Sequence, residues 1–174
     1  MGKSKTEKSP KKSKQEKSSS EKTKEKIETE ETEFNPANIS AISFPMAEVN
    51  LKKKLLKVVK KATKHKHVKR GIKEVVKGIR KGDKGLVVLA GNISPIDVIS
   101  HVPVLCEENN VPYIYVNSKE ELGFAGLTKR PTSCIMIIPG GKGGKAPEYD
   151  EYKESFVEVS KTIKTINENA FSSA

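Results

Sequence analysis

One acidic residue stands alone in the most basic part of this chain. Between Lys52 and Lys81 there are fourteen Lys and Arg residues but a single acid, Glu74. Cations attract phosphate backbones whatever the sequence of the nucleic acid, whereas a carboxylate is repelled by them. We therefore expect Glu74 to accept hydrogen bonds from the donor edges of bases, while its basic neighbours bind phosphates. The alternative is a solvated helix face on which Glu74 pairs with a nearby lysine, worth only ~0 to 1 kcal/mol.

The residues around Glu74 are expected to present this chemistry on one helix. Gly71 stands where the helix begins, and a helix N-terminus offers free backbone N–H groups and a partial positive charge to a phosphate. A glycine there lets a nucleic-acid backbone approach closely. At about 100° per residue, Lys73, Glu74 and Lys77 fall on the face opposite the apolar residues. The segment from Gly71 to Gly82 is therefore a candidate RNA-binding helix.

A glycine-rich run at 140–145 raises the alternative of a nucleotide-binding enzyme. A phosphate-binding P-loop requires glycine, four residues and then Gly-Lys-Ser/Thr. Here Lys145 is followed by Ala146, and Pro139 occupies the position of the first glycine. The dinucleotide fingerprint fails as well, because Ala146 replaces its third glycine. We therefore predict a linker at 140–145 and no cofactor; ATP affinity independent of RNA would favour the enzyme.

The histidines and cysteines form no recognisable catalytic or metal site. His65 and His67 have ligand-pair spacing, but they lie among cations that would repel a metal, so we expect both at the surface. Cys106 and Cys134 lie in apolar contexts, which predicts buried, reduced thiols in an intracellular protein. Two acids follow Cys106 and would raise its pKa rather than activate it. The chain is predicted not to be an enzyme, and no apolar stretch has the ~20 residues of a membrane span.

Apolar periodicity predicts the elements that hold these residues. Apolar side chains recur at helical spacing from Ala47 to about Thr63, and again through the final segment. Ser94 as N-cap and Pro95 at the first helical position predict a helix that runs to about Asn109. A short helix is expected from about Ser118 to Gly123. Three runs of β-branched or aromatic residues are predicted strands: Leu86–Ala90, Tyr113–Val116 and Cys134–Ile138.

These elements predict the fold class and the domain boundary. Helices that alternate with strands apolar on both faces indicate an α/β fold, a three-layer α/β/α sandwich around a small mixed sheet. Residues 1–33 are rich in Lys, Glu and Ser, and Ile27 is their only sizeable apolar residue. Such a segment cannot bury enough apolar surface to offset the entropy of ordering. We therefore expect a disordered tail at 1–34 and one RNA-binding domain at 35–174.

Several short motifs between residues 45 and 140 occur in an order and spacing typical of one known family. They are Arg70-Gly-Ile-Lys-Glu-Val-Val-Lys77, Leu86-Val-Val-Leu-Ala-Gly91, Ser94-Pro95, His101-Val-Pro-Val-Leu-Cys-Glu107, Val111-Pro-Tyr-Ile-Tyr115, Ser118-Lys119, Leu122-Gly123 and Lys129-Arg-Pro-Thr132. In these motifs the chain resembles the kink-turn RNA-binding ribosomal protein family. Within it, the first and last motifs are most similar to the core protein of eukaryotic box H/ACA small nucleolar ribonucleoproteins, which guide pseudouridylation.

The resemblance implies a non-catalytic RNA-binding subunit of the nucleus and nucleolus. Its implied partners are H/ACA guide hairpins, the pseudouridine synthase dyskerin and the small accessory proteins of the particle, with no membrane. A ribosomal or spliceosomal kink-turn-binding protein of the same family is the alternative.

The resemblance also implies roles for individual residues. Gly71, Lys73, Glu74 and Lys77 would meet the sheared base pairs of a bent RNA stem, and Arg70 would also bind RNA. An unstacked nucleotide would be received by a second group: Val98, Lys119, Lys129 and Arg130.

Lys73 departs from the family pattern, because most kink-turn binders have Asn at this position. Asn both donates and accepts at a base edge, whereas Lys only donates and is a mobile point charge. We therefore predict weaker discrimination of kink-turns from other bent or looped stems.

Overall fold

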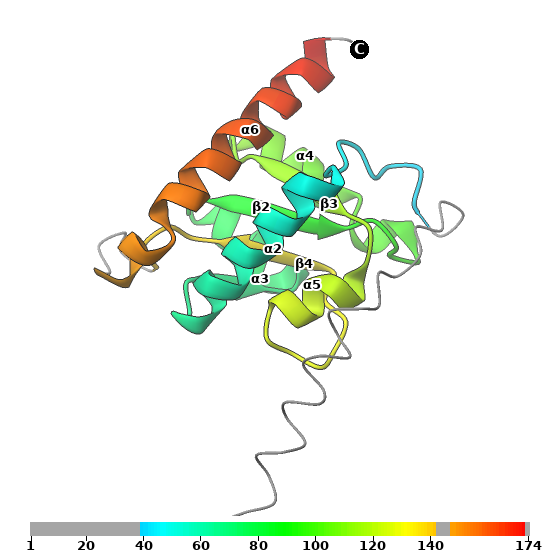
Figure 1. Ribbon diagram of the computed structural model, residues 1–174. Helices are drawn as coiled ribbons and strands as arrows, with labels where there is room; N and C mark the ends of the chain where they lie inside the picture. Colours follow the sequence, from blue (N-terminus) through cyan, green and yellow to red (C-terminus); the bar gives the residue numbers. More distant parts are fainter. Residues whose placement is uncertain (1–38, 142–146, 173–174) are drawn as a thin grey trace, which may run out of the picture. The chain divides into compact units, whose positions relative to one another are not determined.

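The computed structural model describes residues 39–141 and 147–172 (Figure 1). The predicted tail at 1–34 and residues 142–145 of the predicted linker lie outside these residues. The α-helices are Val49–Lys64 (α2), Ile72–Arg80 (α3), His101–Glu108 (α4), Lys119–Ala125 (α5) and Lys153–Ser172 (α6). The strands are Val68–Arg70 (β1), Leu86–Ala90 (β2), Tyr113–Val116 (β3) and Cys134–Ile137 (β4). Short 3-10 helices span Ile96–Val98 (η2) and Pro147–Glu151 (η3).

The strands form one mixed sheet in the order β1-β4-β2-β3. β2 and β3 are parallel, and β4 runs antiparallel to both of its neighbours, β1 and β2. The strands predicted at Leu86–Ala90 and Tyr113–Val116 are confirmed, and β4 ends one residue before the predicted Ile138. β1 was not predicted, because its sequence, Val-Lys-Arg, continues the lysine-rich stretch and becomes a strand only by pairing with β4.

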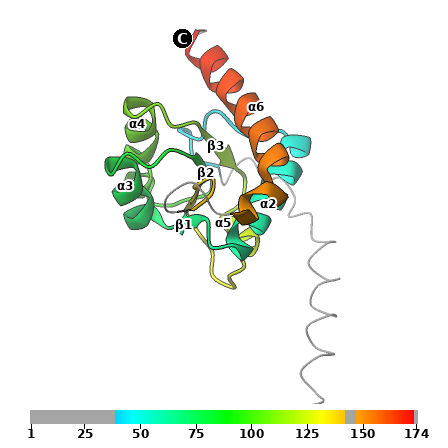
Figure 2. The ribbon, with the colours of Figure 1, turned by 90° about the vertical axis from the view of Figure 1, so that its left-hand side faces the viewer.

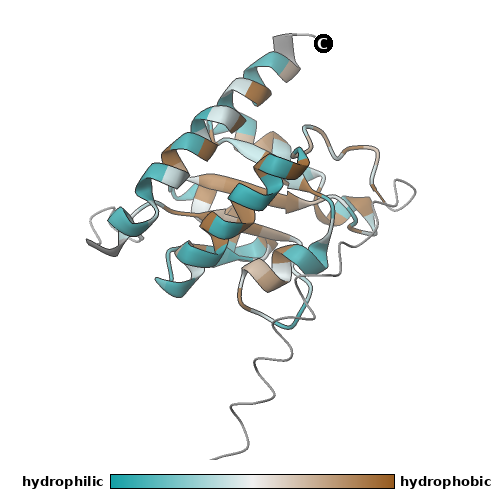
Figure 3. Ribbon diagram, in the orientation of Figure 1, coloured by the Kyte–Doolittle hydropathy of each residue, from teal (hydrophilic) through white to brown (hydrophobic). Residues whose placement is uncertain are grey.

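Helices cover both faces of the sheet, so the predicted three-layer α/β/α sandwich is confirmed (Figure 2). Leu86, Val88 and Ala90 of β2 pack into a core with α2, α5 and α6. Val87 and Leu89 pack into a second core with α3 and α4. Successive strand side chains point to opposite faces, so one strand supplies both cores. Figure 3 shows the apolar strands between helices whose outer faces are hydrophilic.

The helix predicted to begin at Pro95 is broken into two pieces. Pro95 has extended backbone angles, η2 follows it, and α4 begins only at His101. In one continuous helix, Pro103 would lack the N–H that bonds to the carbonyl of Ile99, and its ring would clash with that carbonyl. A start at His101 places Pro103 in the first turn, where proline is tolerated.

The helix predicted at Ser118 is confirmed at its start and wrong at its end. The Ser118 hydroxyl oxygen accepts hydrogen bonds from the N–H groups of Glu120 and Glu121, at 3.2 and 3.4 Å. The helix continues past Gly123 to Ala125. Gly123 is buried, and a Cβ there would overlap the carbonyl oxygen of Arg130. This glycine therefore serves close packing and does not end the helix.

The expected surface position is wrong for His67. His67 is buried, and its Nδ1 lies 2.7 Å from the Tyr152 hydroxyl, whereas His65 is half-buried with its Nε2 3.1 Å from a Glu151 oxygen. Cys106 and Cys134 are free and buried, as predicted. Within 39–141 and 147–172, no helix has the length and apolarity needed to span a bilayer.

Candidate nucleic-acid interface

The predicted RNA-binding residues lie on segments that meet at one edge of the sheet. β1, β2 and β3 end at this edge and β4 begins there, because β4 is antiparallel to β1 and β2. The register pairs Arg70 with Ile135, Leu89 with Cys134, and Ala90 with Val116. We call this the loop edge. It comprises the segments that adjoin the sheet there: Gly71 with the start of α3, Gly91–Ile99 with η2, Asn117–Lys119 with the start of α5, and the loop 126–133.

Backbone hydrogen bonds join neighbouring segments of the loop edge. The Gly71 N–H donates to the Cys134 carbonyl at 2.9 Å, and the Gly91 N–H donates to the Val116 carbonyl at 2.7 Å. The Thr132 N–H donates to the Lys119 carbonyl at 3.0 Å, which connects the loop 126–133 to α5. Residues far apart in the sequence are thereby held in one surface.

Asn92 links the segment after β2 to the start of α5. Its Oδ1 accepts a hydrogen bond from the Lys119 N–H at 2.8 Å, and its Nδ2 donates to Glu120 Oε2 at 3.2 Å. The Ser118 hydroxyl also donates to Glu120 Oε2, at 2.6 Å. Burial alone would raise the pKa of the Glu120 carboxyl. The hydrogen bonds from Ser118, its own backbone and Asn92, with the charge of Lys119, outweigh burial and lower that pKa.

The outer face of α3 carries the lone acid of the basic stretch. Gly71 has a φ of +83°, which favours glycine, and precedes the first helical residue. Lys73, Glu74 and Lys77 are exposed, as predicted. Glu74 Oε2 accepts a hydrogen bond from the Arg70 backbone N–H at 3.2 Å, in an exposed position. Glu74 is therefore not held by a buried partner, and its carboxylate stays accessible to a ligand.

The second predicted group is divided among η2, α5 and the loop 126–133. Val98 is 39% exposed on η2, and Lys119 is half-buried at the first position of α5. Lys129 and Arg130 are exposed in the loop. Arg130 packs close to Gly123 through its carbonyl, while its N–H donates to Thr128 Oγ1 at 3.2 Å.

The loop edge joins these predicted residues to others that the sequence reasoning missed. Lys119 is tied directly to the loop 126–133, and Gly71 is tied to the first residue of β4. Lys77 lies further along α3, and the Val98 N–H donates within its own segment, to the Pro95 carbonyl at 3.4 Å. Asn92 is one of these missed residues. The signal that could have identified it is a polar residue directly after a buried strand of a mixed sheet, close to a capped helix start.

The chemistry available at the loop edge is recognition of a polyanion with polar groups. Cations, a carboxylate, backbone N–H groups and an exposed valine can bind phosphates, base edges and a splayed base. The described residues contain no group of His, Cys, Asp and Glu side chains that could hold a metal ion. Burial first, then Cys134 and Glu107, raises the pKa of the Cys106 thiol to about 12. Such a thiol is a poor nucleophile at neutral pH.

Comparison with known proteins gives consistent results. Residues 53–146 match the model of the Ribosomal protein L7Ae/L30e/S12e/Gadd45 family. The H/ACA ribonucleoprotein complex subunit nhp2 of Schizosaccharomyces pombe is 65% identical over 102 residues, 59% of this chain and 66% of that protein. This is slightly under two thirds of the yeast protein's length. The H/ACA ribonucleoprotein complex subunit 2-like protein of Arabidopsis thaliana is 50% identical over 130 residues, 74% of this chain and 83% of that protein.

A solved structure supports the same assignment. The Giardia lamblia 15.5kD RNA binding protein aligns with a TM-score of 0.64 and 30% identity, and the alignment covers 74% of this chain and 99% of that one. The resemblance inferred from the motifs is therefore confirmed by sequence and by fold. With its mixed sheet between two helical layers, this chain belongs to the Ribosomal protein L7Ae/L30e/S12e/Gadd45 family.

Proposed function

We propose that this chain is the RNA-binding core subunit of an H/ACA ribonucleoprotein and has no catalytic role of its own. Relatives at 50 to 65% identity are named as subunits of that complex. The observation that carries the proposal is the loop edge, where the helix start with the exposed Glu74 and its lysines is hydrogen-bonded to β4, and the loop that precedes β4 is hydrogen-bonded to Lys119. Such a surface suits an RNA whose backbone and base edges are both presented.

The start of α3 would bind the bent part of an RNA stem. The backbone N–H groups of the first turn of α3, from Ile72 to Glu74, would contact phosphates. The side chains of Arg70, Lys73 and Lys77 would contact phosphates and acceptor edges. Glu74 would exchange its weak bond with the Arg70 N–H for hydrogen bonds from base amino groups. That exchange is inexpensive, because the present bond is exposed.

The remaining residues would receive a nucleotide that has left the stack. Val98 supplies apolar contact for a base, and Lys119, Lys129 and Arg130 supply cations for the adjoining phosphates. Lys73 would distinguish base edges less well than Asn, because it only donates and is a mobile point charge. We therefore propose that discrimination between kink-turns and other bent stems is weaker than in relatives with Asn at this position.

The proposal names partners and a compartment. The RNA partners would be guide hairpins, and the protein partners would be the pseudouridine synthase dyskerin and the small accessory proteins of the particle. Support comes from the names of the relatives, which describe subunits of one complex. Guided pseudouridylation and ribosome biogenesis would place the protein in the nucleus and nucleolus. The alternative within the family is a ribosomal or spliceosomal kink-turn protein, and Lys73 argues against it.

Residues 35–174 would bind RNA without the help of residues 1–34. The proposal is supported by the composition of the first segment, which lacks apolar residues for a core. Deletion of residues 1–34 is expected to leave the melting temperature and the discrimination between RNAs unchanged. A marked loss of either would mean that this segment belongs to the folded or binding unit.

The experiment that tests the proposal compares two RNAs of equal length and charge. One carries tandem sheared pairs beside a bulge, and the other is a regular hairpin. Glu74→Gln keeps the size of the side chain but removes its charge, and should reduce the preference for the bent RNA about tenfold, as expected for one lost base contact. Arg130→Ala should reduce the same preference.

The two RNAs also separate base recognition from a general charge effect. If Glu74 acts only by repelling phosphates, Glu74→Gln will strengthen binding to both RNAs equally. That result would contradict the proposed role, as would an unchanged preference. Lys153→Ala, an exposed charge change on α6, is the control and should leave the preference intact.

A further inference from the structure

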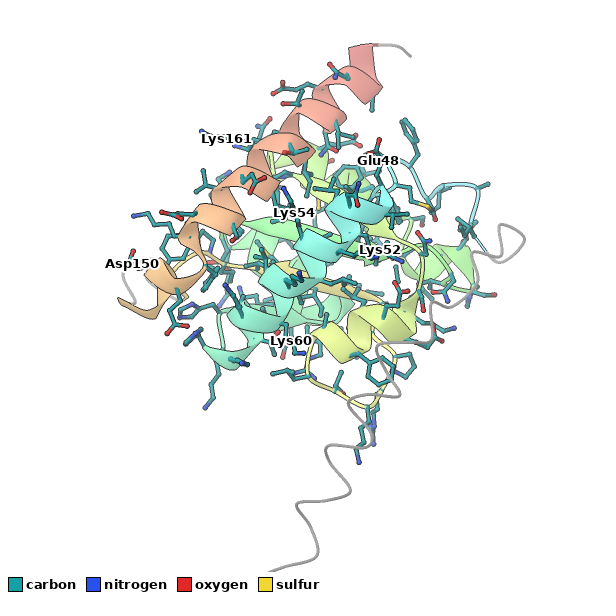
Figure 4. All side chains as sticks on the ribbon, in the orientation of Figure 1. Glu48, Lys52, Lys54, Lys60, Asp150 and Lys161 are labelled. Carbon is teal, nitrogen blue, oxygen red and sulfur yellow. The ribbon has the colours of Figure 1, made fainter. Side chains whose placement is uncertain are left out.

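A second basic surface lies between α2 and α6, in the helical layer that does not contain α3. Here a groove of about 390 Å³ has lysines along one side, and we call it the lysine groove. Figure 4 shows the face of the molecule on which α2 and α6 lie, with Lys54 and Lys60 on α2. The groove is lined by Lys54, Lys57, Val58, Lys60, Lys61, Lys64, Ser155, Glu158 and Val159.

The lysines of the groove follow the helical repeat. Lys54, Lys57, Lys61 and Lys64 are spaced three or four residues apart, so they form a row along one side of α2. Successive turns of a helix lie 5.4 Å apart, which is on the order of the spacing of phosphates along a strand. The buried residues Leu55, Val58, Val59 and Ala62 pack α2 against the core, with Val58 at the border of the groove. The row therefore has one orientation, toward the groove and the solvent.

The positive charge of the groove is largely uncompensated within the described residues. Glu158 is the only acid among the lining residues, and it pairs with Lys54 at 2.6 Å. No ion pair within 39–141 and 147–172 involves Lys57, Lys60, Lys61 or Lys64. Like charges three and four residues apart disfavour a helix. This arrangement lowers the stability of the free protein and would be relieved by a bound polyanion.

We propose that the lysine groove binds the phosphodiester backbone of RNA, as a second contact surface apart from the loop edge. This deepens the proposed function and rests on it. Lysine provides only donors, and no aromatic side chain lines the groove on which a base could stack. The groove therefore binds phosphates without reading sequence, and adds affinity rather than selectivity.

The position of α2 allows one RNA to reach both surfaces. Lys52, in the first turn of α2, forms an ion pair with Glu121 of α5 at 3.1 Å. α5 begins at the loop edge with Lys119, so the lysine row starts near that edge and continues away from it along α2. An RNA bound at the loop edge would need an additional helical arm to contact the row. A short RNA would occupy the loop edge alone.

The test uses the full chain with two RNAs that share one bent core and differ in the length of one helical arm. The variant combines Lys57→Ala, Lys61→Ala and Lys64→Ala. The control combines Lys84→Ala, Lys153→Ala and Lys161→Ala, three exposed lysines outside the groove. Circular dichroism verifies that both variants are folded. Dissociation constants are measured as a function of salt concentration.

The expected result is specific to the groove and to the longer RNA. For the extended RNA, the groove variant should reduce the slope of log K against log salt by about 2 to 3, because each phosphate contact contributes ~0.9. The control should leave that slope nearly unchanged. For the short RNA, the two variants should behave alike.

Two results would overturn the proposal. One is an equal effect of the two triple variants on the extended RNA, which would mean that only net charge matters. The other is tight binding of poly-L-glutamate that competes with neither RNA and is lost in the groove variant, which would indicate an acidic protein as the occupant. Failure of the groove proposal is distinguishable from failure of the proposed function at the loop edge. The latter is tested separately, by the effect of Glu74→Gln on the preference between bent and regular RNAs of short length.

Discussion

The side-chain oxygen of Asn92 accepts a hydrogen bond from the Lys119 N–H at 2.8 Å, across 27 positions of sequence. The same amide donates to Glu120. One side chain thus connects the segment that carries Val98 to the helix start that carries Lys119. The relative position of these two candidate RNA contacts depends on this link.

Asn92→Ala is expected to lower both stability and RNA selectivity. The substitution leaves the half-buried Lys119 N–H without its acceptor, so the free energy of unfolding should fall by about 1 to 2 kcal/mol. Urea denaturation measures this change. Asn109→Ala is the matched control, because Asn109 Nδ2 donates to the Leu105 carbonyl at 2.9 Å at the far end of α4. The control should lose stability without losing selectivity; equal selectivity in both variants would contradict the role of Asn92.

Glu120→Gln is expected to weaken the pH dependence of stability. The folded-state pKa of Glu120 lies below its ordinary value of 4.5. Its ionised form therefore stabilises the fold above about pH 4.5, and this contribution is lost as the pH falls through the lowered pKa. Melting temperatures between pH 6 and pH 3 should fall less steeply in the variant than in the natural chain. Identical slopes would show that the hydrogen bonds from Ser118 and Asn92 do not lower the pKa of the Glu120 carboxyl.

Local patterns predict the elements of this fold better than its long-range contacts. The spacing of apolar residues predicts α2, β2 and β3, because these elements contribute their own buried side chains to the two cores. β1 becomes a strand only by pairing with β4, and the burial of His67 depends on Tyr152, 85 positions away. These features have no local signal.

The candidate site also combines features that local sequence patterns predict with features that depend on long-range contacts. Its charged residues are visible in the sequence, because a lone acid among lysines is a local pattern. The link through Asn92 requires knowledge of which strand ends lie next to each other. The break between η2 and α4 depends on Pro103, eight residues after the apparent helix start at Pro95. The sequence shows that proline, but the helix cap signal before it is the stronger local pattern.

The two cysteines are expected to be unreactive in the folded protein. Burial raises the pKa of both thiols to about 12 from an ordinary value of 9.0, which lowers the thiolate fraction near pH 8 roughly a thousandfold. Alkylation by iodoacetamide should therefore be slow in the native state and complete after denaturation in urea. Rapid native labelling of either thiol would mean that the core opens around β4 or α4 far more often than its packing suggests.

Gly123→Ala tests whether the position of the loop 126–133 matters for RNA recognition. A Cβ at this residue would overlap the Arg130 carbonyl oxygen, so the loop must shift. We expect a loss of about 1 to 3 kcal/mol in stability, as for other overpacked sites, together with weaker preference for the bent RNA.

Gly82→Ala is the control. Its φ of +80° makes alanine unfavourable by about 1 to 2 kcal/mol, but nothing lies within 4 Å of the added carbon, and the residue follows α3 at the end opposite Gly71. If both variants lose stability and only Gly123→Ala loses RNA preference, the effect comes from the position of Arg130 and its loop. If both keep their preference, the loop 126–133 does not contribute to recognition of the RNA.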